Sequence, residues 1–143
     1  MHKMQLSKID AAKIRYLLAF ERFTGIKTIE CFNFNKSIVF MVNPMLIKAF
    51  RKKQKKIKEL SRFLKADVKI LAMPKNTDAE TITKFVNRLV APHTIKGINL
   101  SGQKLTINSG ISKAFLLGKG KKNLPLLKEL FKKYFKISEL EIR

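Results

Sequence analysis

A stretch of glycine and lysine near the C-terminus has the composition of an anion-binding loop. Residues 116–130 read Leu-Leu-Gly-Lys-Gly-Lys-Lys-Asn-Leu-Pro-Leu-Leu-Lys-Glu-Leu. Gly118 and Gly120 carry no Cβ, so the backbone can turn tightly there and approach a ligand closely. Positive charge around the turn comes from Lys119, Lys121 and Lys122.

A helix is expected to begin directly after this glycine–lysine loop (residues 118–123). Asn123 is a favoured N-cap and Pro125 is tolerated in a first helical turn, so the helix is predicted to start near Leu124. The free N–H groups of a helix N-terminus attract anions, and the neighbouring lysines favour phosphate as that anion. The alternative is that the two glycines only end one helix and allow a turn before the next.

The overall charge of the chain points to a polyanionic partner. Its 143 residues contain 31 lysines and arginines against 10 acidic residues, which gives a net charge of +21 and a pI of about 10.4. The 45% apolar fraction is that of a folded protein and not of a disordered one. Nucleic acid is the first partner that this charge predicts, and an anionic membrane surface is the second.

Other residue types exclude several classes of protein. Cys31 is the single cysteine, which excludes an internal disulfide and a cysteine metal cluster, and His2 and His93 have no partner at ligand spacing. No apolar run reaches the roughly 18 residues of a membrane span, and the N-terminus lacks the apolar core of a signal peptide. We therefore expect a soluble cytoplasmic protein with no metal, no cofactor and no membrane partner.

The elements that position the loop follow from hydrophobic periodicity. In the first half, Ser7 and Asp10 form a possible capping box, and an apolar stripe ending at Gly25 predicts the first helix. Two strands are predicted over residues 28–32 and 37–42, with a turn at 33–36. A short helix over 45–50, a second apolar stripe and a strand over 68–71 follow. The two stripes are Ile14, Leu17, Leu18, Phe20 and Phe23, then Ile57, Leu60, Phe63 and Leu64.

The second half repeats this order. Thr77 and Glu80 form a second possible capping box, an apolar stripe predicts a helix, and Pro92 ends that helix. A hairpin is predicted from residues 94–100 and 103–107, turning at Ser101 and Gly102. A short helix over 111–117, the loop, a helix over 124–135 and a strand over 138–142 follow. The stripe is Ile82, Phe85, Val86, Leu89 and Val90, and the hairpin pairs Ile98 and Leu100 with Leu105 and Ile107.

A shift of 67 residues superposes the two halves, so we predict two modules, at residues 1–73 and 77–143. The shift places Arg51, Lys52, Lys53 and Gln54 of the first half on Gly118 to Lys121 of the second. A basic run alone is typical of a solvated helix face, but here it coincides with the loop of the other half. This coincidence favours a binding role for the run, which comprises Lys48, Arg51, Lys52, Lys53, Lys55 and Lys56.

The repeated order, with a basic loop between two helices, resembles the K-homology (KH) RNA-binding module of the second, prokaryotic topology. Within that class the chain resembles the archaeal-type NusA transcription factor over residues 8–143. The resemblance implies an α+β fold of two tandem type II KH modules, each a small three-stranded sheet covered by helices. The similar segments are Ile14-Arg-Tyr-Leu-Leu-Ala-Phe-Glu-Arg-Phe-Thr-Gly25, Phe85-Val-Asn-Arg-Leu-Val-Ala-Pro92 and Leu117-Gly-Lys-Gly-Lys-Lys-Asn123, the last near the family's Ile-Gly-Lys-Gly-Gly-Lys-Asn.

The resemblance implies a Gly-x-x-Gly loop that grips the backbone of about four nucleotides, with bases in an adjacent apolar groove. In this chain the loop reads Gly118-Lys-Gly-Lys121, so lysine replaces the second glycine. Lys122 and Asn123 are further RNA-binding candidates, and the groove is expected near Ile107, Leu117 and Leu124. The first loop has no glycine, so it either acts as an electrostatic clamp through its side chains or only supports the second module.

Three functions remain open. The leading one is a monomeric, non-enzymatic factor of transcription elongation or termination that binds single-stranded RNA, with RNA polymerase as a further candidate partner. The second is a ribosomal or ribosome-assembly protein, which the lost glycines favour. The third is a degenerate KH module that binds another protein. An enzyme is not expected, because Asp67 and Asp78 have no paired carboxylate, His93 has no neighbouring nucleophile and no Walker motif is present.

Overall fold

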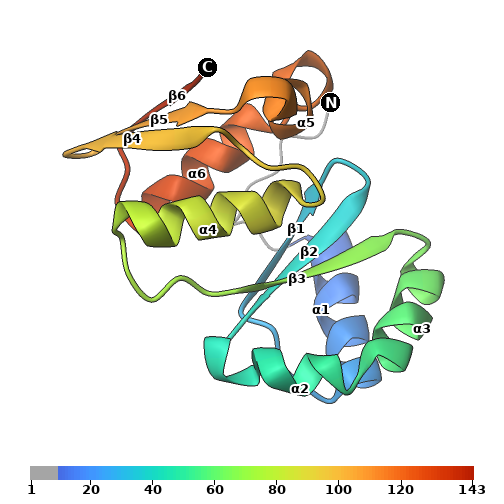
Figure 1. The fold of residues 1–143 in the computed structure, drawn as a ribbon. Coiled ribbons are helices and arrows are strands. Elements are labelled where there is room, and N and C mark those ends of the chain that lie inside the picture. The colour runs from blue at the N-terminus through green and yellow to red at the C-terminus, as the bar shows by residue number, and fades with distance from the viewer. Residues whose placement is uncertain (1–9) are drawn as a thin grey trace. The chain divides into compact units, whose positions relative to one another are not determined.

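The computed structural model describes residues 10–143, which divide into two compact units between Met73 and Pro74 (Figure 1). We call residues 10–73 the first unit and residues 74–143 the second unit. Each unit contains one three-stranded sheet with helices packed against it. The fold is therefore α+β, as the sequence predicts.

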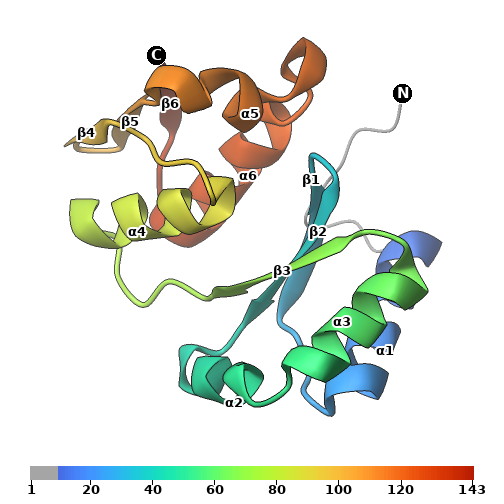
Figure 2. The same cartoon turned by 45° about the vertical axis from the view of Figure 1, so that its right-hand side comes forward.

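The first unit runs helix–strand–strand–helix–helix–strand. Its sheet has the order β1-β2-β3, in which β1 and β2 are antiparallel and β2 and β3 are parallel. Helices α1 and α3 lie on one face of this sheet (Figures 1 and 2). The elements are α1 (Ala11–Thr24), β1 (Glu30–Phe34), β2 (Ser37–Val42), α2 (Ile47–Arg51), α3 (Gln54–Leu64) and β3 (Asp67–Ala72).

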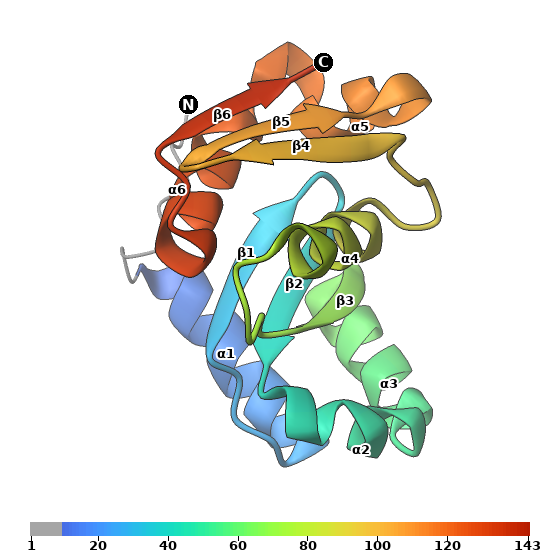
Figure 3. The same cartoon turned by 60° about the vertical axis from the view of Figure 1, so that its left-hand side comes forward.

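The second unit has the same order and the same mixed sheet. Its strands follow the order β4-β5-β6, with an antiparallel and then a parallel pair. Helices α4 and α6 lie on one side of this sheet (Figures 1 and 3). The elements are α4 (Ala79–Val90), β4 (Gly97–Ser101), β5 (Lys104–Asn108), α5 (Lys113–Leu117), α6 (Leu124–Phe135) and β6 (Glu139–Ile142).

Aspartate side chains cap the first helix of each unit. Asp10 accepts a hydrogen bond from Lys13 N at 2.8 Å, and Asp78 accepts one from Thr81 N at 3.0 Å. The predicted capping box of Thr77 and Glu80 is therefore wrong by one residue, because an aspartate directly before the helix satisfies the free N–H groups. Ser7, the other predicted cap residue, lies outside the described residues.

An aromatic cluster forms the core of the first unit. Phe20 of α1 stacks on Phe40 of β2 with ring centroids 4.5 Å apart, and Phe50 of α2 lies 5.7 Å from Phe20. Ile14 and Leu18 are 46% and 63% exposed, so the predicted stripe of α1 is wrong at these two positions. They lie off the helix face that carries Phe20, which the sheet covers.

Local pattern places the second core correctly. All five residues of the predicted α4 stripe are buried, and Phe85 lies 5.4 Å from Phe135 of α6 between ring centroids. The hairpin register is also as predicted, because Ile98 pairs with Ile107 and Leu100 with Leu105. Helix α6 spans the predicted residues, Leu124–Phe135.

A buried ion pair joins α1 to β1 in the first unit. Lys13 Nζ contacts Glu30 Oε1, and the two side chains are 13% and 5% exposed. Glu30 also accepts a hydrogen bond from Cys31 N at 3.2 Å. The Cys31 thiol is buried beside this pair, and this burial raises its pKa to about 12.

The two units differ most in the connection between their last two helices. Only Lys52 and Lys53 separate α2 from α3, whereas the six residues 118–123 separate α5 from α6. Ser37 corresponds to Lys104 by the predicted shift of 67, but their parallel partners Asp67 and Glu139 are 72 apart. The constant shift is therefore wrong beyond α5: it grows by five residues by the last strand, mostly through the four extra residues of this connection.

Candidate nucleic-acid interface

The glycine–lysine loop begins with a residue, Gly118, whose backbone dihedral angles only glycine adopts easily. Gly118 has φ 74° and ψ 171°, a region that is essentially restricted to glycine. A Cβ on this residue would lie 2.7 Å from Asn123 Nδ2 and 2.9 Å from Asn123 Cγ. Both the dihedral angles and the packing therefore require glycine here.

Two later residues of the loop, Gly120 and Lys121, have left-handed backbone. Gly120 has φ 64° and Lys121 has φ 57°. Lys121 thus has a backbone conformation that glycine favours. The loop therefore carries a charged side chain within a glycine-like turn.

Asn123 does not act as the predicted N-cap. Its backbone is already helical, with φ −81° and ψ −15°, and its side chain makes no capping hydrogen bond. The side chain is buried, with 4% of the residue exposed, and Nδ2 donates to the carbonyl of Leu116 at 3.2 Å. The amide is therefore held inside the loop, whereas the sequence predicts that Asn123 contacts RNA directly.

The outer surface of the loop is cationic and has free hydrogen-bond donors. Lys119, Lys121 and Lys122 are exposed, and none has an ion-pair partner within residues 10–143. Lys121 N donates to Gly118 O at 3.1 Å and Lys122 N to Lys119 O at 3.3 Å. Within the same described residues the N–H groups of Lys119 and Gly120 have no acceptor, so both can donate to an anion.

The corresponding basic region of the first unit is not a loop. Arg51 is the last residue of α2 and Gln54 is the first of α3, so the predicted loop consists of Lys52 and Lys53 alone. Their N–H groups donate to Ala49 O at 3.3 Å and Phe50 O at 3.1 Å. The two N–H groups of this connection are therefore not available to an anion, which would meet the lysine side chains and the free N–H groups at the start of α3.

Those side chains are well placed for that contact. Lys53 is partly buried, while the other predicted residues of the run are exposed: Lys48, Arg51, Lys52, Lys55 and Lys56. Lys56 Nζ lies 3.7 Å from Glu59 Oε2 in an exposed pair, which is worth little in stability. The run therefore forms a cationic surface over the end of α2 and the start of α3.

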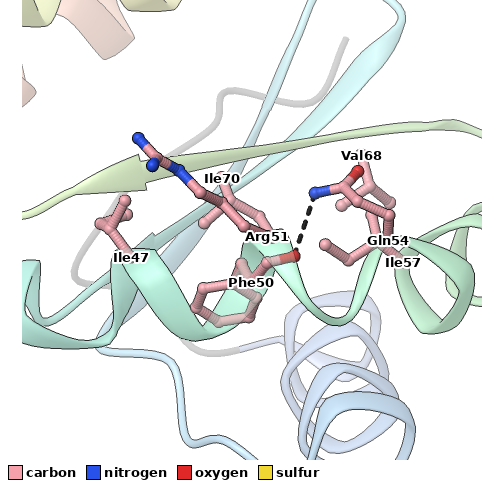
Figure 4. Close-up of a pocket in the computed structure, with 7 residues that line it drawn as sticks. All are labelled: Ile47, Phe50, Arg51, Gln54, Ile57, Val68 and Ile70. Carbon is pink, nitrogen blue, oxygen red and sulfur yellow. Dashed lines mark hydrogen bonds between the residues drawn. The ribbon is translucent and has the colours of Figure 1, made fainter.

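A groove lies beside this cationic surface (Figure 4). It has a volume of about 280 Å³ and takes its walls from α2, α3 and β3. Arg51 and Gln54 provide its polar groups, and Gln54 Nε2 donates to Phe50 O at 3.0 Å. The apolar lining is Ile47, Phe50, Ile57, Val68 and Ile70.

The position of this groove partly corrects the prediction. Ile107 is fully buried in the core of the second unit, so it cannot line a groove, while Leu117 and Leu124 are half-buried. The groove lies instead in the first unit, where Phe50 and Ile57 line it.

The groove also has access to backbone groups, because β3 is an edge strand. Met73 N donates to Val42 O at 2.8 Å, so by the alternation of a parallel pair Val68 and Ile70 direct their N–H and C=O groups away from β2. Both residues line the groove. A planar ligand in the groove would therefore meet an apolar surface together with a donor and an acceptor.

The helices that follow the two basic regions begin without acidic or capping side chains. In contrast to α1 and α4, neither α3 nor α6 has a side-chain cap or an acidic residue in its first turn. Lysines at these positions oppose the helix dipole, which favours negative charge at an N-terminus. An external anion would satisfy both the lysines and the free N–H groups.

Residues 10–143 contain no group of three or more histidine, cysteine or acidic residues that could hold a metal ion. Within the same range, no helix combines the length and the apolarity that a membrane crossing requires.

Comparison with known proteins gives a structural likeness and no family. No family model matches the chain, and no curated protein matches it. The chain is similar to the solved structure described as "Crystal structure of APE1850", with 24% sequence identity and a TM-score of 0.55. The match covers 94% of this chain and 100% of that one. At this identity the likeness shows a shared fold.

Proposed function

We propose that this protein is a non-enzymatic, single-stranded RNA-binding protein built from two KH-like modules. The glycine–lysine loop of the second unit carries this proposal. It combines two left-handed residues, free N–H groups at Lys119 and Gly120, and exposed lysines without ion-pair partners within residues 10–143. This combination suits a loop that holds phosphates of a nucleic-acid backbone.

The arrangement of each unit supports a KH assignment. Helix–strand–strand–helix–helix–strand is the order on which the resemblance to the prokaryotic KH topology rests, and both units have it. The loop lies between two helices, as the KH grip requires. The net charge of +21 suits RNA as the partner.

The two units divide the work in this proposal. The second unit holds phosphates through its loop, by backbone donors and lysines together. The first unit has no free backbone donor between its helices, but it has the cationic surface and the apolar groove. We propose that the first unit binds an unpaired base in this groove, and that Arg51 and its neighbouring lysines contact the phosphates on either side of that base.

The biological role within RNA binding follows from the resemblance. A role in transcription elongation or termination, as in archaeal-type NusA, is the role we propose. A ribosome-associated role is the second candidate, and the first unit favours it, because a protein docked on folded RNA needs surface charge more than a loop grip. Both roles share the RNA contacts described above.

Fluorescence anisotropy of a labelled single-stranded RNA over a salt series tests the proposal. The loop variant Lys119→Glu/Lys122→Glu is compared with Lys132→Glu/Lys133→Glu in the last turn of α6. Both change the net charge from +21 to +17, and the control residues lie ten and eleven residues beyond Lys122 in sequence. Circular dichroism checks that both variants remain folded.

We expect the loop variant to lose much more affinity than its control. With about six phosphates neutralised, the wild-type slope of log affinity against log salt is about −4, and removing two contacts should reduce it by about 1.4. Equal losses in both variants would show diffuse charge attraction and contradict the loop as the binding site. The groove is tested by Ile57→Glu. If a base occupies the groove, this variant should weaken RNA binding more than Lys58→Glu at the exposed neighbouring position does.

A further inference from the structure

We propose that Asn123 is a positioning residue that holds the glycine–lysine loop in its binding conformation, with Gly118 as its socket. The inference deepens the proposed function, because it concerns the same loop. It also changes the role of two predicted RNA-binding residues. Asn123 acts through the backbone of the loop, and Gly118 lacks a Cβ for the sake of Asn123 and not of the ligand.

Asn123 is hydrogen-bonded both to the end of α5 and to the start of α6. Its N–H donates to Leu117 O at 2.9 Å, and its Nδ2 donates to Leu116 O at 3.2 Å. Its own carbonyl accepts from Leu127 N at 2.9 Å inside α6. The residue therefore closes the loop at its base and leaves residues 119–122 on the outside.

Gly118 provides the space in which the Asn123 side chain lies. A Cβ at Gly118 would lie 2.7 Å from Nδ2, a distance that real Cβ atoms do not show. At Gly120, by contrast, a Cβ would meet no atom within 4 Å. The two glycines of the loop therefore serve different purposes: Gly118 admits the amide, and Gly120 provides a left-handed turn.

The first unit contains the same device in a shorter form. Gln54 Nε2 donates to Phe50 O at 3.0 Å, and Phe50 is the second-last residue of α2. Leu116, the acceptor in the second unit, is likewise the second-last residue of α5. Both units thus fix the junction of their helices with a side-chain amide on the same carbonyl, although the connections differ in length by four residues.

This repetition separates a positioning role from ligand binding. In the first unit no phosphate-gripping loop exists, yet the amide contact is present. If the side-chain amide served only to bind a ligand, it would not need to contact the preceding helix, which is α5 for Asn123 and α2 for Gln54. The shared contact is explained if the amide sets the angle and spacing between the two helices.

Amide hydrogen exchange and RNA anisotropy on the full chain test the inference together. The variants are Asn123→Ala, the isosteric Asn123→Asp and, as a control, Asn108→Ala at an exposed asparagine at the end of β5. We expect both Asn123 variants to speed exchange of the Lys121 and Lys122 amides by tenfold or more. The amide of Leu130 in the middle of α6 should exchange as in the wild type.

RNA affinity should fall about tenfold in both Asn123 variants, while the salt slope stays near that of the wild type because every lysine remains. Unchanged loop exchange, with or without a loss of affinity, would overturn the positioning role. If the wild type binds no RNA but the exchange effect is present, the proposed function fails and the positioning role stands.

Two further variants guard against a general loss of structure. Gly118→Ala should weaken RNA binding strongly in the wild type and by a smaller factor in Asn123→Ala, because only the strained dihedral angles remain. An equal factor in both backgrounds would overturn the socket. In the first unit, Gln54→Ala should speed exchange at Lys52 and Lys53; an unchanged rate there would overturn the shared device.

Discussion

Lys121 offers a test in which stability and RNA affinity should change in opposite directions. Its φ of 57° places an L-residue in the left-handed region, which costs about 1–2 kcal/mol. Glycine removes this cost but loses about 0.5–1 kcal/mol through the greater freedom of the unfolded chain. Lys121→Gly should therefore change the free energy of unfolding by about 0 to +1.5 kcal/mol.

Lys122 provides the matched control for this substitution. It is the next residue, also exposed, and its φ of −62° and ψ of −25° are those of ordinary helical backbone. Lys122→Gly should lower the free energy of unfolding by about 1 kcal/mol, as glycine does in helical positions. Each variant removes one lysine from the loop, so each should reduce the salt slope of RNA binding by about 0.7 if that lysine meets a phosphate.

Tyrosine fluorescence during urea unfolding can report on the second unit alone. The chain has no tryptophan and two tyrosines, Tyr16 in the first unit and Tyr134 in the second. In a Tyr16→Phe background, Tyr134 is the remaining tyrosine, and its transition gives the stability of its own unit. If Lys121→Gly destabilises this unit as much as Lys122→Gly does, Lys121 does not hold the left-handed conformation and our account of the loop is refuted.

Two further predictions concern the buried polar groups of the first unit. Glu30→Ala leaves Lys13 buried without this partner, so the free energy of unfolding in urea should fall by about 3–5 kcal/mol. The double variant Lys13→Met/Glu30→Leu should recover most of this loss. A fall below about 1 kcal/mol in Glu30→Ala would contradict a buried pair. Because burial raises the pKa of Cys31 from 9.0 to about 12, the unfolded state releases this proton first as pH rises. This thiol should therefore resist iodoacetamide in the folded protein, and stability should fall between pH 9 and 12 by up to about 1.4 kcal/mol per pH unit. Cys31→Ala, measured by urea unfolding at pH 8 and 10, should lack this part of the decrease, and an identical decrease in both proteins would contradict it.

The elements that sequence predicts well are those whose pattern is local and strong. Helix α6 and the α4 stripe follow from apolar residues at helical spacing, and Leu105 and Ile107 fix the hairpin register by alternation. The first stripe fails at Ile14 and Leu18 for a physical reason. Apolar residues on two faces of α1 leave the choice of the buried face to the sheet, which sequence alone does not show.

The residue types of the candidate site can be predicted from the sequence, but the way in which its side chains are arranged cannot. Sequence identifies the loop lysines, because glycine and lysine beside a helix start are a recognisable combination. The role of Asn123 is not readable in this way. An asparagine before a helix normally caps it, whereas here the side chain turns back toward Leu116, a choice that depends on the empty space at Gly118.

The length of the helix connection decides how each unit can meet an anion. Both N–H groups of the two-residue connection between α2 and α3 are bonded, so this connection offers an anion lysine side chains and no backbone donor of its own. Six residues between α5 and α6 allow a closed base at Asn123 and an open rim at Lys119 and Gly120. Since both units keep the amide contact, the four extra residues add backbone donors without disturbing the helix junction. Under the proposed function, the first unit would then meet RNA through its charged surface and apolar groove, and the second unit through the backbone donors of its loop.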